Sequence, residues 1–236
     1  MRILAIDTAT ENCSAALLLD ERILQREQLL ERGAAEAILP MVDELLTEAG
    51  VELPMLSAIA FGRGPGAFTG VRLAASVTQG LAFGAGLKVV PVSDLQALAQ
   101  RVLDDAQAIE RVLVCTDARM REVYWGCFER TAEGFARASG EEHVTRPEEV
   151  RSAMPWSSTS GAVPEALAGV GSGFTAYPRL REDLGLQIVL GELRPRAAEV
   201  ARLAAPEVAA GRILSAEQAL PVYLRDDVTR APRGAS

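Results

Sequence analysis

The first hundred residues alternate between short apolar runs and longer stretches with apolar residues at helical spacing. Short apolar runs bounded by polar turns predict strands. The predicted strands occupy residues 2–7, 13–19, 22–30, 57–61 and 88–92. The longer stretches predict helices over residues 34–49, 69–83 and 93–103. Gly50 should end the first helix and Ser93 should cap the third, while Pro40 should kink the first helix or mark its first turn.

The same pattern begins again near residue 110. Residues 111–117 form an apolar run that ends in Asp117, just as the first strand ends in Asp7, and residues 121–129 predict a second strand. This similarity indicates an internally duplicated fold. A polar break near residues 104–110 then divides the chain into an N-terminal lobe, 1–106, and a C-terminal lobe, 107–236. The second lobe should also contain a loop, a helix and a frayed tail, at residues 156–173, 196–210 and 226–236.

The order of predicted elements is typical of one α/β architecture. Three strands are followed by helix, strand, helix, strand and helix, and a second half then begins again with a strand. This architecture is the two-lobed, internally duplicated ribonuclease-H-like ATPase fold of the actin, hexokinase and Hsp70 type. In such folds an aspartate at the end of the first strand of each half meets phosphate or its metal ion. Asp7 and Asp117 hold these positions. The alternative interpretation is that each aspartate only begins a turn after a strand.

A glycine-rich segment, residues 62–72, joins a predicted strand to a helix. Glycines allow close approach of the backbone to another group, and a helix N-terminus attracts anions, so the segment is a candidate phosphate site. The P-loop pattern GxxxxGK[ST] is not met, and a tight turn that lets helices pack closely is the alternative. The candidate nucleotide-binding residues are Asp7, Thr8, Gly64, Gly66 and Asp117.

The charge balance and the reactive side chains restrict the function classes. The chain has 24 basic and 32 acidic residues, a net charge of −8, which argues against a long RNA-binding surface of its own. Cys13, Cys115 and Cys127 lie far apart in apolar runs, so we expect them to be buried and reduced. His143, the sole histidine, lies in a polar segment and is expected at the surface. The sequence therefore predicts no catalytic group and no metal site. No run suits a signal peptide or a membrane span, which favours the cytoplasm.

Two further stretches have an unusual composition. The helix at 69–83 carries one charge, Arg72, so it must be covered on most sides, either by its own chain or by a partner docked on it and on the helix at 34–49. Residues 117–125 mix charged and aromatic side chains, and could form a binding rim between the lobes or a half-buried strand with arginine–glutamate pairs. The rim residues are Arg119, Arg121, Glu122, Tyr124 and Trp125.

Five segments together resemble one known family: MRILAIDTAT, ILPMV, GRGPGAFTGVR, TDARMREVYW and LPVYLRDDV. They look like the TsaB family, also called YeaZ, and the resemblance is strongest over residues 1–125. It implies an actin/hexokinase/Hsp70-like fold in two lobes. It also implies pairing with a homologous catalytic subunit, TsaD, which transfers a threonylcarbamoyl group to the adenosine next to the anticodon of tRNA. An ATPase, TsaE, joins the complex.

The resemblance also implies that the chain is a non-catalytic partner or activator. TsaD carries an HxxxH metal motif, and the corresponding stretch here, residues 31–37, has no histidine. By resemblance, tRNA is reached only through the complex, no membrane is involved, and no cofactor is firmly bound, with ATP and Mg²⁺ possible only at the complex interface. The first two helices would form the docking surface for TsaD, or for a second copy when the chain is alone. The implied interface residues are Ala37, Ile38, Met41, Leu45, Arg72, Ala74, Val77, Thr78 and Leu81.

Two other functions remain open at this stage. One is an ATP-hydrolysing or sugar-kinase-like enzyme of the same fold that uses Asp7 and Asp117 around Mg²⁺. The other is a direct tRNA-binding protein, which the net charge disfavours. The arginines that would carry such binding are Arg119, Arg121, Arg225, Arg230 and Arg233.

Overall fold

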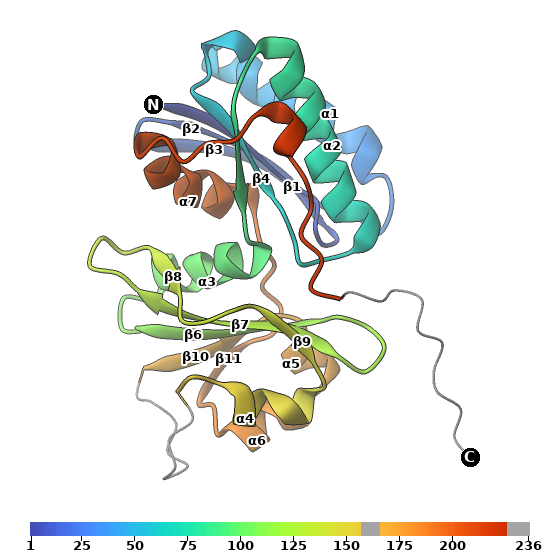
Figure 1. Ribbon diagram of the computed structural model, residues 1–236, viewed down its shortest axis with the longest axis vertical. Helices are drawn as coiled ribbons and strands as arrows, with labels where there is room; N and C mark the ends of the chain where they lie inside the picture. The colour runs from blue at the N-terminus through green and yellow to red at the C-terminus, as the bar shows by residue number, and fades with distance from the viewer. Residues whose placement is uncertain (157–165, 226–236) are drawn as a thin grey trace.

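The computed structural model describes residues 1–156 and 166–225, and it contains two stacked α/β halves (Figure 1). The first half has a five-stranded sheet of order β3-β2-β1-β4-β5. Strands β1 to β3 are antiparallel, and β4 and β5 run parallel to β1. The bounds are β1 Arg2–Asp7, β2 Asn12–Leu19, β3 Arg22–Leu29, β4 Ala58–Gly62 and β5 Val89–Val92.

Helices cover both faces of this first sheet, because its central strands are apolar on both sides. Successive residues of a strand point to opposite faces. Leu4 and Ile6 therefore pack under α1 (Ala34–Ala49) and α2 (Phe68–Ala85), while Ile3 and Ala5 pack against α7 (Ala197–Ala209). The short 3₁₀ helix η1 (Leu53–Met55) precedes β4.

The second half has a sheet of order β11-β10-β6-β7-β8, with β9 paired to β7. Its strands are β6 Arg111–Asp117, β7 Val123–Arg130, β8 Ala136–Ala138, β9 His143–Thr145, β10 Leu167–Val170 and β11 Ile188–Leu190. Helix α3 (Asp94–Asp105) covers one face, where it packs on Val112 and Val114. Leu113 and Cys115 point to the other face, which is covered by three short helices: α4 Val150–Ala153, α5 Gly173–Ala176 and α6 Arg179–Leu184. Two 3₁₀ helices complete the half and the C-terminal region: η2 Pro147–Glu149 and η3 Ala216–Gln218.

Two helices pack on the half opposite to the one that the sequence order suggested. Helix α3, assigned to residues 1–106, packs on β6, β7, β8 and β10, whereas α7, assigned to residues 107–236, packs on β1, β2, β4 and β5. The cause is that the central strands of the first sheet need an apolar cover on their second face, to which α7 contributes Ala197, Val200, Ala201, Leu203 and Ala204. The division between residues 106 and 107 therefore does not follow the packing.

Other sequence expectations differ in detail. The predicted strand at 121–129 starts later, at Val123. Residues 157–165 of the predicted loop lie outside the described residues, but its remainder contains β10 and the start of α5. The run Leu167–Val170 has only four residues and includes a glycine, so it gave little strand signal. Pro40 lies within α1, well after its first turn. The tail from Asp226 lies outside the described residues.

Candidate functional site

Two buried carboxyl groups meet where the first sheet faces α3. Asp7 ends β1, and its Oδ1 accepts a hydrogen bond of 2.9 Å from the N–H of Ala9. Asp94 opens α3 and accepts the N–H of Gly64. Burial raises the pKa of Asp7 to about 6, and burial together with the negative charge of Asp7 raises the pKa of Asp94 well above its usual range. Asp7 Oδ2 and Asp94 Oδ1 are buried and have no other hydrogen-bond partner among the described residues, and a proton held by Asp94 and shared with Asp7 would satisfy both.

The glycine-rich segment packs directly against the backbone of the loop after β1. A methyl group on Gly66 would lie 2.5 Å from the carbonyl oxygen of Ala9, and one on Gly70 would overlap the carbonyl oxygen of Thr8. The N–H of Ala67 donates to the Ala9 carbonyl at 2.7 Å, and Thr8 Oγ1 donates to the Gly70 carbonyl at 2.7 Å. These glycines therefore admit the loop after β1 rather than a ligand, as the tight-turn alternative predicts.

Four of the five candidate nucleotide-binding residues lie in the first half, and Asp117 lies at the end of β6 in the second. Asp7, Thr8 and Gly64 are buried by the chain itself, and Gly66 is half-buried against the loop after β1. Asp7 Oδ1 and Thr8 Oγ1 are hydrogen-bonded to the chain's own backbone, whereas the buried Asp7 Oδ2 has no hydrogen-bond partner among the described residues. Sequence reasoning missed Asp94, since an aspartate after an N-cap serine is an ordinary helix start.

Asp117 has a different role, in the second half. Its Oδ1 accepts the N–H of Arg119 at 2.9 Å and the hydroxyl of Tyr177 at 3.4 Å, and its own N–H donates to Ser172 Oγ at 3.0 Å. Asp117 thus holds the turn after β6. Within residues 1–156 and 166–225, no three His, Cys, Asp or Glu side chains gather in a way that could hold a metal ion.

The structure corrects several of the implied interface residues. Ile38, Leu45, Ala74 and Thr78 have 0% exposure because they face the first sheet, and Met41 is only 9% exposed. Ala37, Val77 and Leu81 are half-buried, and Arg72 is exposed. The side chains of Ile38, Met41 and Leu45 therefore belong to the protein's own core, as the alternative of an intrachain cover predicted for them.

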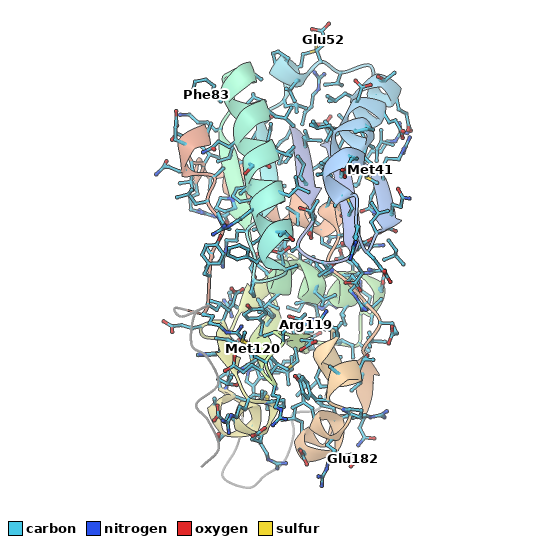
Figure 2. All side chains as sticks on the ribbon, turned by 90° about the vertical axis from the view of Figure 1, so that its right-hand side faces the viewer. Met41, Glu52, Phe83, Arg119, Met120 and Glu182 are labelled. Atoms are coloured by element: carbon cyan, nitrogen blue, oxygen red, sulfur yellow. The ribbon has the colours of Figure 1, made fainter. Side chains whose placement is uncertain are left out.

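A different face of α2 is open to solvent. We call it the α2 outer face, and its residues recur at helical spacing: Thr69, Arg72, Ser76, Gly80, Phe83 and Gly84. It bears one charge, Phe83 is 72% exposed, and nothing lies within 4 Å of where a Cβ on Gly80 or Gly84 would stand. Leu39 and Pro40 of α1 are also exposed. Figure 2 shows α1 and α2 side by side on this side of the molecule, with Met41 on α1 and Phe83 near the far end of α2.

The C-terminal segment, residues 214–225, runs from the first half to the second. Leu214 pairs with Val89, and the N–H of Val222 donates to the Arg63 carbonyl at 2.7 Å. Tyr223 accepts a hydrogen bond of 2.7 Å from Arg72, whose guanidinium lies 3.7 Å from the centre of the Phe68 ring. The segment then reaches the turn between β6 and β7 through Arg225, which forms an ion pair with Glu122.

The predicted rim residues have separate surroundings. Trp125 is buried, and its Nε1 donates to Thr145 Oγ1 at 3.0 Å. His143 is half-buried, with its ring centre 4.5 Å from that of Trp125, so the expectation of a surface histidine is only partly right. Tyr124 is half-buried, whereas Arg119 and Arg121 are exposed in the turn. Of the predicted rim residues, therefore, only Arg119 and Arg121, in the turn between β6 and β7, have exposed side chains.

Two simpler expectations can be compared with the structure. Cys13, Cys115 and Cys127 are buried free thiols, as predicted. Within the part of the chain that the structure describes, no helix has the length and apolarity needed to cross a membrane.

Each α/β half begins with two antiparallel strands, and the first strand of each pair ends in an aspartate. This arrangement defines a protein of the two-lobed actin-like ATPase fold class. Component A of (R)-2-hydroxyglutaryl-CoA dehydratase from Acidaminococcus fermentans has this likeness in fold alone, with a TM-score of 0.51 at 12% identity over 89% of this chain and 99% of that one. The chain belongs to the TsaB (YeaZ) family, as one sequence relative and one solved structure show.

A family profile described as "TsaD: tRNA N6-adenosine threonylcarbamoyltransferase" matches residues 23–187. The chain is 42% identical over 233 residues to the tRNA threonylcarbamoyladenosine biosynthesis protein TsaB of Escherichia coli (strain K12), which covers 97% of this chain and 96% of the relative. A crystal structure from Pseudomonas aeruginosa, of a protein described as similar to peptidase YeaZ, matches with a TM-score of 0.86 and 46% identity, over 95% of this chain and 99% of that one.

Proposed function

We propose that this chain is a non-catalytic partner subunit of a TsaD-type transferase that makes threonylcarbamoyladenosine next to the anticodon of tRNA. The observation that carries the proposal is the α2 outer face, which is small, nearly uncharged and exposed. Gly80 and Gly84 leave room for the backbone of a second helix to approach closely. Phe83 adds an exposed aromatic anchor of the kind that is enriched at protein interfaces.

The proposed docking surface therefore consists of the α2 outer face with Leu39 and Pro40 of α1. A homologous TsaD-type subunit would lay its corresponding helices on this surface. In the absence of that subunit a second copy would take its place, since an isologous contact uses the same patch on both chains. A TsaE-type ATPase would join this pair, and tRNA would reach the chain only in the complex, in the cytoplasm.

The buried position of Asp7 supports a subunit without chemistry of its own. Asp7 and Thr8 would be needed at phosphate in an ATP-hydrolysing or sugar-kinase-like enzyme, but Thr8 Oγ1 and one oxygen of the buried Asp7 are already hydrogen-bonded to the protein's own backbone. Any ATP and Mg²⁺ would then bind at the interface of the complex rather than in this chain alone.

Reconstituted synthesis tests the proposal. Threonylcarbamoyladenosine is measured with TsaD-type and TsaE-type proteins, the adenylate-forming enzyme, tRNA, threonine, bicarbonate and ATP, with and without this chain. Product is expected only when the chain is present, although the chain alone neither hydrolyses ATP nor modifies tRNA. Equal product without the chain would contradict the proposal.

The docking surface is tested with charge substitutions at exposed positions. Ser76→Glu and Gly80→Glu place a carboxylate on the α2 outer face without burying it in the core. Both variants are expected to keep the wild-type circular dichroism spectrum and to lose association with the TsaD-type subunit in size-exclusion chromatography. Ala138→Glu, at an exposed position of β8, is the matched control and should associate normally. Assembly of the two α2 variants would show that the surface is wrong.

A further inference from the structure

The turn between β6 and β7 is built in a conformation that its residues disfavour. Arg119, Met120 and Arg121 all have positive φ, at 61°, 54° and 62°. This left-handed region suits glycine or asparagine, because a Cβ crowds the following carbonyl oxygen. A tight hairpin of this kind would ordinarily carry an Asn-Gly or Gly-Gly pair. Three consecutive residues with side chains here place backbone strain in an exposed turn, and such strain is typical of functional sites.

The rest of the protein holds this turn rigidly. The N–H of Ala118 donates to the Glu122 carbonyl at 3.0 Å, and Asp117 anchors Arg119. Arg225 clamps the turn from the C-terminal segment: its guanidinium donates to the Ala118 carbonyl at 3.3 Å, pairs with Glu122, and reaches the Met120 sulfur at 3.5 Å. The position of the tip residues is therefore fixed.

The side chains at the tip are free for a ligand. Arg119 is 88% exposed although it pairs with Asp117, and Met120 is 68% exposed. Arg121 is also exposed. Figure 2 shows Arg119 and Met120 below α1 and α2, on the same side of the molecule as these helices. The turn thus presents two guanidinium groups beside the proposed docking surface.

The chemistry of the tip favours a polyanion over a protein surface. The α2 outer face is nearly uncharged and carries an exposed aromatic side chain, as an interface core does, whereas the exposed tip carries two positive charges and no aromatic side chain. Guanidinium groups bind phosphate oxygens through two parallel hydrogen bonds, and Arg is the residue that proteins prefer for this contact. The two chemically different surfaces on one side therefore suit two different partners.

We propose that Arg119 and Arg121 contact the phosphate backbone of the RNA while the transferase subunit is docked on the α2 outer face. This proposal rests on the proposed function, since a chain of net charge −8 would hold RNA only weakly without a partner. Met120 sits between the two arginines as an apolar contact for a sugar or base.

The test uses the assembled complex of this chain with the TsaD-type subunit, and unmodified tRNA as the probe. The double variant Arg119→Gly/Arg121→Gly is compared with Arg119→Lys/Arg121→Lys, and with Arg137→Ala as a control for a lost charge at an exposed site of β8. Subunit association is measured first without RNA, and tRNA affinity is then measured over a series of salt concentrations.

The glycine variant is expected to associate normally and to bind tRNA several-fold more weakly. Its slope of log affinity against log salt should be less steep by about 2, one for each lost phosphate contact. Its urea midpoint should rise, because glycine fits the left-handed backbone. The lysine variant should keep the slope, because its charge is unchanged, but lose part of the affinity, because an ammonium group cannot form the two parallel hydrogen bonds. Arg137→Ala should match wild type.

Three outcomes would overturn the proposal in distinguishable ways. Normal association with unchanged tRNA affinity would leave the proposed function standing and remove the RNA contact. Loss of association before RNA is added would mean that the turn binds an acidic protein surface instead. Failure of the wild-type chain to associate at all would refute the proposed function, and the RNA contact with it.

Discussion

Gly70 lies where α2 touches the loop after β1, and its replacement by alanine is expected to destabilise the fold. A Cβ at this position would overlap the carbonyl oxygen of Thr8 and lie 3.0 Å from the carbonyl carbon. These are backbone atoms, held by the hydrogen bond of 2.7 Å from Thr8 Oγ1 to the Gly70 carbonyl. A second hydrogen bond of 2.7 Å, from the Ala67 N–H to the Ala9 carbonyl, ties the same two segments together. The overlap is therefore relieved only by moving α2 away from the loop.

The size of the effect follows from three contributions. Overpacking that shifts the backbone costs about 1–3 kcal/mol. A weakened hydrogen bond between the helix and the loop adds about 1 kcal/mol. Alanine recovers about 1 kcal/mol, because it is a better helix former than glycine. The free energy of unfolding should fall by about 1–3 kcal/mol, which for a chain of this size lowers Tm by roughly 2–12 °C.

Gly80→Ala is the matched control in the same helix. Nothing lies within 4 Å of where its Cβ would stand, so only the gain in helix propensity remains. This variant should be more stable than wild type by about 1 kcal/mol, with Tm higher by about 2–4 °C. Thermal and urea unfolding followed by circular dichroism compare the two. If Gly70→Ala unfolds at or above the wild-type temperature, the close approach of α2 to Thr8 does not constrain the fold.

Three further predictions concern buried and bridging groups. Asp7 and Asp94 have raised pKa values in the folded state, so the stability linked to their protonation is present at low pH and is lost as the pH rises. Asp94→Asn should reduce this loss, measured as urea midpoints across about pH 5–9. An unchanged pH profile would contradict the shared proton. A double-mutant cycle of Arg225→Ala and Glu122→Ala should give a coupling of about 1–2 kcal/mol in urea unfolding, whereas simple additivity would mean that the ion pair does not clamp the turn. Burial raises the pKa of Cys13 to about 11 and that of Cys127 to about 12. A thiol reagent at pH 8 should therefore react only slowly with the native protein, and with all three cysteines in denaturant. Fast labelling of the native protein would show that the cysteines are accessible.

The local pattern was sufficient to predict most of the first half. Strands β1 to β5 and helices α1 to α3 lie close to their predicted ranges. Most of these strands are continuous apolar runs, β3 alternates only in part, and each helix has apolar residues at helical spacing. The location of α7 could not be predicted in this way. The apolar stripe of α7 shows that the helix packs against another element but does not show which one. Its position is determined by the apolar second face of β1 and β2, almost 200 residues earlier in the chain.

The candidate site was predictable only where it depends on local spacing. The α2 outer face could have been found from the recurrence of Ser76, Gly80 and Gly84, but small residues on every side of this helix hid the difference between its two faces. The meeting of Asp7 with Asp94 depends on long-range packing that no motif encodes. The left-handed turn at Arg119 gave no signal either, because glycine, the usual marker of that conformation, is absent from it.

The position of α7 has a consequence for how the chain folds during synthesis. The last strand of the first sheet ends at Val92, but the helix that covers the second face of this sheet does not begin until Ala197. At a translation rate of about 5–20 residues per second, roughly 5–20 s pass before that helix is made. During this interval Ile3, Ala5 and Ala16 have no permanent cover, so the nascent first sheet exposes an apolar face that a chaperone can bind. The first half of the molecule is therefore completed last.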